Sequence, residues 1–335
     1  YLVRDAQIKG ERIKILERDP VAGGACDGIH DPKNGFIMRG GREMDNHFEV
    51  MWDVYKDVPS SSDPNVSVLD EYRWLNKEDP NYSLCRATAH CGKKLPTGHD
   101  FTLDKEAQNE LLKLFLTPEK DLEDKKISDC FDDHFYRSNF WLYWQTMFAF
   151  QEWSSALEMK RYLQRYVHHI DGLPDFTALR FTRYNQYESM ILPLLKYLTD
   201  HGVTFIPHCE VKNVIFDAKN NDHKVATAIE VELEGKPHTY KLSEDDLVFI
   251  TNGSCVDSTK YGNQTTAPDY QSLKNKEGDS WNLWRKMASQ VNDGSFGNVD
   301  KFSDNIEETN WMSATVDVDD TLLPYITNIT QRDPH

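Results

Sequence analysis

The chain has 335 residues, of which 39% are hydrophobic and 12% aromatic, so it can bury a large core and form more than one domain. Its net charge of −17 excludes nucleic acid as the main partner, because phosphate binding needs a basic face, and argues against general attraction to anionic membranes. No apolar run reaches the ~20 residues of a spanning helix and no leader is visible, so we expect a cytoplasmic protein, with peripheral membrane contact left open.

The six cysteines favour reduced thiols over a disulfide framework. They lie at positions 26, 85, 91, 130, 209 and 255 and include no Cys-x-x-Cys pair. A zinc site of the usual spacing is therefore not predicted, and we expect no metal ligands.

The start of the chain looks like the second half of a dinucleotide-binding unit. Residues 1–8 predict the end of a helix, residues 12–17 a strand that ends in Glu17, and residues 18–24 a turn closed by Gly23 and Gly24. An acid after such a strand accepts hydrogen bonds from an adenosine ribose. No Gly-x-Gly-x-x-Gly motif occurs, so we expect the preceding strand and phosphate loop to be missing; an ordinary hairpin with a solvated Glu17 is an equal alternative.

The most informative segment is 39–49, Arg-Gly-Gly-Arg-Glu-Met-Asp-Asn-His-Phe-Glu. Its glycines permit close approach of the backbone to a polar ligand, and Arg39 and Arg42 supply forked donors for phosphate or carboxylate. Glu43 beside them has the chemistry of a general base. The segment predicts a cofactor-contacting loop with a catalytic acid residue, and the alternative is a surface ion pair of Glu43 with Arg42 or Arg39.

The middle of the chain predicts helices at 103–115 and 138–165, the second rich in aromatic residues. An aromatic stripe is usually core. Because this one lies in an insertion within a nucleotide fold, an apolar substrate channel is the alternative.

The third part of the chain returns to strands. We expect a helix at 189–201, strands at 203–206, 210–217, 226–233 and 238–242, and a buried strand at 246–254 that runs into the turn Asn252-Gly253-Ser254. Such a turn, at the carboxyl end of a parallel strand, is where an α/β sheet meets its ligand. The order predicts an α/β protein with an FAD-binding Rossmann-like fold of the two-dinucleotide type and a largely helical substrate-domain insertion.

Four stretches, residues 11–24, 39–44, 158–162 and 183–189, together resemble the oleate hydratases, also called myosin-cross-reactive antigens. The resemblance covers nearly the whole chain, and Arg-Gly-Gly-Arg-Glu-Met is its most specific motif. Members of the family are longer at both ends. The variant Asp45-Asn46-His47 is similar to members from lactic-acid bacteria.

The resemblance implies that water adds across a cis double bond of unsaturated C18 fatty acids such as oleate or linoleate, giving hydroxy fatty acids. It implies FAD in a structural role, a homodimer, and weak membrane attachment. The domains it implies are an FAD-binding domain at 1–59 and 177–260, a mainly helical substrate domain at 60–176, and the incomplete start of a further substrate-side region at 261–335.

The resemblance also assigns roles. Glu43 matches the water-activating carboxylate, with partial burial against the flavin; Tyr162 matches the proton donor, and Gln186 matches a residue that orients the substrate. Without the family, Tyr162 is better explained as a core or interface tyrosine, Gln186 as an ordinary helix residue, and His168-His169 as a cap on the Tyr162 helix. The implied cofactor contacts are Glu17, Gly23, Gly24, Arg39, Gly40, Gly41, Arg42, Glu43, Met44, Val211, Asn252, Gly253 and Ser254.

Two other functions fit the same sequence. The first is an FAD-dependent redox enzyme of the amine oxidase type, which would consume an electron acceptor. The second is an inactive fragment or surface antigen that keeps the fold without the chemistry.

Overall fold

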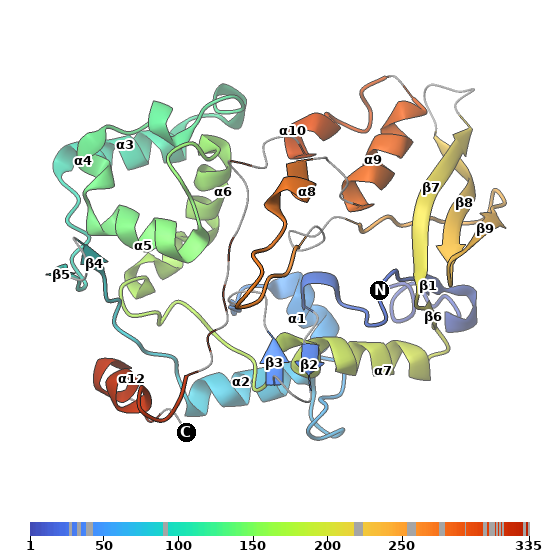
Figure 1. Cartoon of the computed structure of the whole chain (residues 1–335), viewed down its shortest axis with the longest axis horizontal. Helices are drawn as coiled ribbons and strands as arrows, with labels where there is room; N and C mark the ends of the chain where they lie inside the picture. The colour runs from blue at the N-terminus through green and yellow to red at the C-terminus, as the bar shows by residue number, and fades with distance from the viewer. Residues whose placement is uncertain are drawn as a thin grey trace. The chain divides into compact units, whose positions relative to one another are not determined.

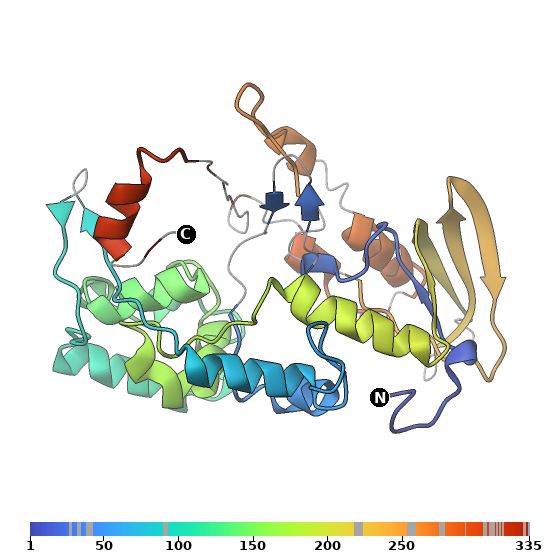
Figure 2. The ribbon, with the colours of Figure 1, turned by 90° about the horizontal axis from the view of Figure 1, so that it is seen from below.

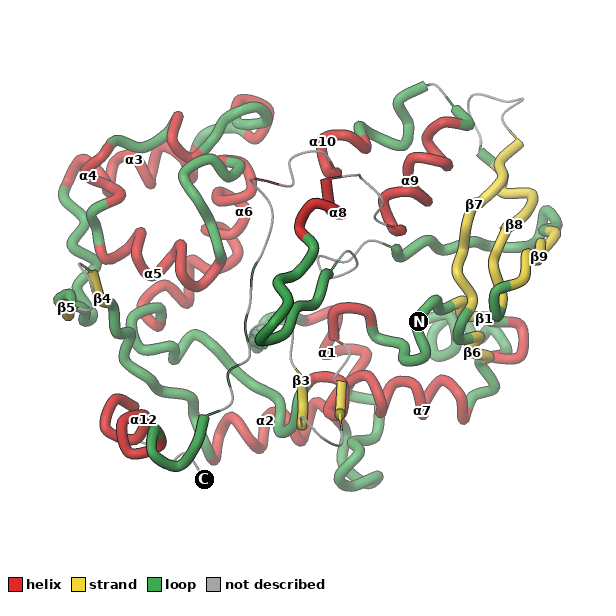
Figure 3. Tube along the Cα trace, viewed as in Figure 1, coloured by secondary structure: helices red, strands yellow, loops and turns green. Residues whose placement is uncertain are grey.

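The structure is a computed structural model. It describes residues 1–26, 29–31, 35–37, 43–89, 93–217, 224–252, 259–274, 279–291, 293–303, 307, 312, 314, 316, 318–330 and 333. The chain divides into two compact units, one formed by 1–42, 50–71 and 182–315, the other by 43–49, 72–181 and 316–335. Helices and small sheets are mixed, which is compatible with the α/β class (Figures 1 and 3). The functional domain boundaries remain a prediction.

The first unit contains the larger sheets. Its described elements are η1 (Gly10–Arg12), β1 (Lys14–Leu16), η2 (Gly24–Cys26), β2 (Ile29–Asp31), β3 (Gly35–Ile37), η6 (Tyr187–Ile191), α7 (Leu192–Asp200), β6 (Thr204–Ile206), β7 (Cys209–Asp217), β8 (Val225–Leu233), β9 (Lys236–Lys241), α8 (Tyr270–Lys274), α9 (Asp279–Ser289) and α10 (Val299–Ser303). Helices α1 (Glu49–Tyr55) and α2 (Val68–Glu78) have residues in both units.

Strand β1 pairs in parallel with β6, which follows α7 directly (Figure 1). The predicted strands at 12–17 and 203–206 and the predicted helix at 189–201 are therefore confirmed, the helix beginning with a π-helical turn. Gly10 makes the approach possible: a Cβ there would lie 2.0 Å from the carbonyl oxygen of His201 and 2.8 Å from the nitrogen of Val203. The chain turns between α7 and β6 at Gly202, whose φ is +88°.

Replacing Gly10 by alanine should lower the free energy of unfolding of the first unit by about 1–3 kcal/mol, because the obstructing atoms are backbone and the core cannot give way cheaply. Urea unfolding followed by circular dichroism measures the effect. Gly98→Ala is the matched control, since no atom lies within 4 Å of its Cβ position. Equal stability of the two variants would contradict the close packing of Gly10.

An antiparallel sheet, β7–β8–β9, forms one end of the first unit (Figure 2). Positive φ angles at Glu234 and Gly235 close the β8–β9 hairpin, as a two-residue turn between twisted strands requires. Val214 of β7 packs with Leu283 and Met287 of α9 in a small core. The three strands predicted for this region are confirmed, with ends shifted by one or two residues.

The second unit is largely helical. Its described elements are β4 (Thr88–Ala89), β5 (Lys93–Lys94), α3 (Lys105–Leu116), η3 (Glu119–Asp121), η4 (Ile127–Asp129), α4 (Asp133–Tyr136), α5 (Asn139–Phe148), α6 (Ala156–Tyr166), η5 (Val167–Gly172) and α12 (Leu323–Thr330). Trp144 and Phe135 are fully buried at its centre, and the Phe140 and Trp144 rings stack at 5.6 Å. The aromatic stripe thus packs as core, as the commoner interpretation expected.

The single helix predicted at 138–165 is in fact two helices. Ala149 adopts a left-handed φ of +57° and ends α5, and Ser155 starts α6 by accepting a hydrogen bond from the Glu158 nitrogen. Similarly, residues 1–8 form turns instead of the predicted helix end, because Gln7 has a φ of +55°.

The buried strand predicted at 246–254 was wrong over its described part, residues 246–252, which pair with none of the described strands. Leu247 is 73% and Phe249 67% exposed. An apolar run becomes a buried strand only when neighbouring strands accept its backbone hydrogen bonds.

Two further features concern the described residues. None of their helices is both long and apolar enough to cross a bilayer. Cys26, Cys85, Cys130 and Cys209 are free thiols, as the reduced state expected from the sequence requires.

Candidate functional site

The segment that carries Glu43 is fixed to the second unit by its backbone. Met44 donates a hydrogen bond to the Arg180 carbonyl at 2.7 Å and accepts one from the Arg180 nitrogen at 3.1 Å. The Met44 side chain is buried, whereas the Tyr72 hydroxyl donates to the Asn46 side chain at 2.8 Å. These contacts give residues 43–49 a defined position without regular secondary structure.

Asp45 connects this segment to the end of α6. Its carboxylate is 1% exposed and accepts hydrogen bonds from the His47 backbone nitrogen at 2.8 Å and from the ring of His169 at 3.2 Å. Arg165 lies 3.6 Å from the other carboxylate oxygen and also donates to the His47 carbonyl. A buried carboxylate needs such partners, because an unpaired one costs several kcal/mol.

Helix α6 places two phenols on one face, Tyr162 and, one turn later, Tyr166. The Tyr162 ring is 36% exposed and packs edge-on against Phe148 and Phe150 at 5.3 and 5.1 Å. Burial raises the pKa of Tyr162 above its usual value, and the charge of Glu158 raises it further. The hydroxyl therefore keeps its proton at neutral pH.

Glu43 and Tyr162 belong to the same unit, and both raise the pKa of Tyr166. Burial is the main reason why the pKa of Tyr166 is raised, and Asp45, Tyr162 and Glu43 raise it further, while Arg165 lowers it. Glu43 and Tyr162 thus both influence Tyr166, which lies one turn after Tyr162 on α6. Their catalytic roles remain a prediction. We expected Glu43 to be partly buried. Among the described residues it is exposed, so they do not supply that burial.

Arg39, Gly40, Gly41 and Arg42 lie outside the described residues, as do Gly253 and Ser254. The predictions for these six residues are therefore not examined by the structure. Asn252, at the edge of the described part, is partly exposed.

Several predicted site residues belong to the first unit. Glu17 follows β1 and accepts a hydrogen bond from the Asp19 nitrogen at 3.0 Å. Gly23 and Gly24 have φ angles of +125° and +53°, and no atom lies within 4 Å of a Cβ placed on Gly24. Cys26, which ends η2, donates through its thiol to the Gln186 side chain at 3.5 Å. The glycine turn and the predicted substrate residue are thus neighbours.

Val211 lies elsewhere in the same unit. It pairs with Val231 in the β7–β8 ladder, and its side chain packs against the core formed with α9. Its proposed nucleotide contact remains a prediction.

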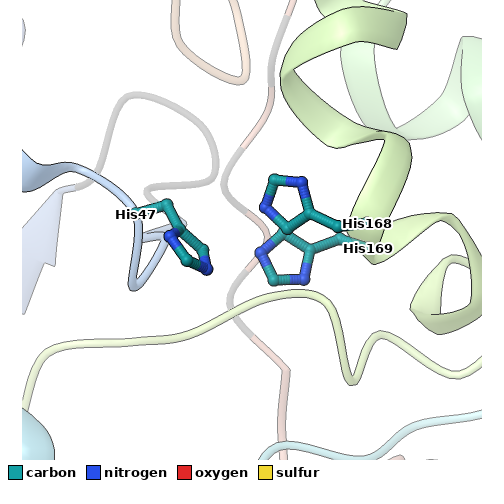
Figure 4. Close-up of side chains that lie close together, drawn as sticks. All are labelled: His47, His168 and His169. Carbon is teal, nitrogen blue, oxygen red and sulfur yellow. The ribbon is translucent and has the colours of Figure 1, made fainter.

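The sequence analysis did not foresee that His47 joins His168 and His169 (Figure 4). The two later histidines lie in η5, which continues α6. Their role as a cap of that helix remains a prediction. The His169 ring is hydrogen-bonded to Asp45, and burial is the main reason why the pKa of His169 is lowered. Within the sequence, the adjacent His168-His169 pair was the local signal for this group, because His47 is distant in the chain.

The chain is similar to known proteins along its whole length. A profile of the MCRA family matches residues 1–335. An oleate hydratase of Streptococcus pyogenes serotype M49 (strain NZ131) is 43% identical over 346 residues, covering 100% of this chain and 56% of the relative. A linoleate hydratase of Lactiplantibacillus plantarum is 31% identical over 311 residues, covering 90% of this chain and 53% of the relative. The chain thus spans about half the length of the curated relatives it matches.

Proposed function

Because the chain belongs to the MCRA family, we propose that it carries the catalytic groups of a fatty-acid hydratase, which adds water to a cis double bond of oleate or linoleate. The observation that carries the proposal is the 43% identity to an oleate hydratase along the whole chain. The membership of Glu43 and Tyr162 in one unit, where both raise the pKa of Tyr166, supports it.

The chemistry needs an acid on one face of the alkene and a base for water on the other. The Tyr162 hydroxyl gives its proton to one alkene carbon, and its raised pKa keeps that proton available at neutral pH. Glu43 accepts a proton from the water whose oxygen bonds to the neighbouring carbon. Glu43 then releases its proton to solvent and the phenolate takes one up, so that both groups regain their starting states, one water molecule has been added and no electrons have been transferred.

The same proposal includes FAD bound on a Rossmann-like fold in a structural role, where it would order and shape the active site. The residues fit such a group: Glu17 follows a parallel strand, and the backbone at Gly24 is open, as close approach of a diphosphate requires. In this arrangement Glu17 would bind the ribose and Gly23 and Gly24 the diphosphate. The further contacts proposed are Arg39 to Met44, Val211 and residues 252–254, with Gln186 beside the glycine turn orienting the substrate.

The wider proposals rest on the family alone. They are a homodimer, peripheral membrane contact, and a substrate domain inserted at 60–176 into an FAD-binding domain made of 1–59 and 177–260. The region at 261–335 would begin a further substrate-side part.

Anaerobic incubation of the chain with FAD and oleate in H₂¹⁸O tests the activity. We expect a hydroxystearate that carries ¹⁸O, detected by mass spectrometry. The absorption spectrum should show that the flavin stays oxidised. Flavin reduction with an oxidised product would instead identify a redox enzyme. Absence of any product, while FAD binds and the protein is folded, would identify an inactive fragment.

A further inference from the structure

We propose that His47, His168 and His169 form a binding site for a divalent late transition metal of the Zn²⁺ type. One ligand nitrogen from each ring lies within 4.8 Å of the others, and the rings point toward one another (Figure 4). The ring centroids of His168 lie 4.8 Å from His47 and 4.2 Å from His169. The proposal of a metal site does not rest on the hydration chemistry proposed above.

Hydrogen bonds to two carboxylates determine which ring nitrogens of His169 and His47 keep a lone pair for a metal. Asp45 can only accept a hydrogen bond, so the contact at 3.2 Å makes Nε2 of His169 the donor and leaves the Nδ1 lone pair for a metal. Glu49 likewise accepts from Nδ1 of His47 at 3.1 Å and leaves Nε2. A carboxylate behind a ligating histidine is the usual support of a metal site, because it fixes the tautomer and the ring orientation.

The geometry needs only a small closure. Two nitrogens bound tetrahedrally to Zn²⁺ at about 2.0–2.1 Å lie about 3.4 Å apart. Ring nitrogens that lie within 4.8 Å of one another need to approach by roughly 1.5 Å at most, which side-chain rotation supplies because His47 and His168 are exposed. Three imidazoles leave the fourth position to water or to another oxygen ligand.

The local charge also favours a cation. Asp45 and Glu49 are the carboxylates beside the histidines, and Arg165 is the opposing cation. The Arg165 guanidinium is committed to Asp45 and lies 5.4 Å over the Phe48 ring. Imidazole nitrogens select zinc, copper, nickel or cobalt over magnesium and calcium, which prefer oxygen ligands.

Titration of the chain, free of any affinity tag, with Zn²⁺ in a calorimeter tests the proposal. We expect one tight site for Zn²⁺. Its affinity should fall by about 100-fold or more in His47→Ala and in His168→Ala, because loss of a ligand costs at least as much as loss of a residue that hydrogen-bonds to a ligand. His99→Ala is the control, because His99 is an exposed histidine of the same unit beside a single carboxylate, Asp175. Its affinity should equal that of the unchanged chain.

Absorption of the Co²⁺-loaded chain gives a second readout that does not depend on activity. Intense visible bands of tetrahedral cobalt, lost in His47→Ala, would support a three-histidine site. Equal Zn²⁺ affinity in the unchanged chain and His47→Ala, or cobalt bands like those of the hydrated ion, would overturn it. Loss of binding in His134→Ala alone would also overturn it, since that result would place the metal at the separate group of Glu106, Asp132 and His134.

Discussion

Replacing Tyr162 by phenylalanine should reduce the turnover of oleate by about 10²–10⁴-fold, the usual contribution of a general acid. The ring would keep its edge-on contacts with Phe148 and Phe150, so the fold and fatty-acid binding should be retained. The hydroxyl is the only group removed. Turnover is measured as hydroxystearate formed per minute, and substrate binding by displacement of a fluorescent fatty acid.

Tyr166→Phe is the matched control, because this tyrosine lies one helical turn further along α6 and also has a raised pKa. Its turnover should stay within a few-fold of the unchanged chain. If Tyr166→Phe were the inactive variant, the donor role would move to that residue. If both variants were fully active, neither phenol would be the acid.

The pH profile gives an independent check on the same group. A proton donor is competent below its pKa, and burial raises the pKa of Tyr162 above the usual ~10 of a phenol. Turnover should therefore not fall between pH 7 and 9 through loss of this proton. A falling limb in that range that disappears in Tyr162→Phe would contradict the raised pKa.

The elements that the sequence predicted well are those whose signal is local. Strands β7 and β8 alternate apolar side chains, and α7 ends at Asp200, just before the turn at Gly202, so periodicity and turn chemistry were enough. The two errors in the predicted helices came from backbone conformations that the residue types do not indicate. Ala149 and Gln7 both adopt left-handed φ angles, which Gly, Asn and Asp adopt far more readily.

In the candidate site, too, local sequence features were predicted and long-range contacts were not. Glu43 and Tyr162 were predicted as site residues from motifs and family resemblance, but nothing in the sequence indicated that Asp45 is buried against His169 and Arg165. That contact joins positions more than a hundred residues apart, and it depends on the backbone pairing of Met44 with Arg180. Long-range side-chain networks of this kind are products of the tertiary fold, so local propensity carries no signal for them.

Replacing Glu43 by glutamine should also reduce turnover by about 10²–10⁴-fold, because the amide has the same shape but cannot accept a proton from water. Glu43 is exposed, so the variant should unfold at the same urea concentration as the unchanged chain. Initial rates with oleate at saturating FAD measure the effect.

Glu49→Gln tests whether the effect belongs to Glu43 in particular, since it removes the other exposed glutamate of the same segment. Its rate should remain within a few-fold of the unchanged chain. The double variant that combines Glu43→Gln with Tyr162→Phe tests whether the two groups act together. If both act in one step, its rate should fall by less than the product of the two single effects. A fully active Glu43→Gln variant would remove the carboxylate from the mechanism and leave water activation to another group.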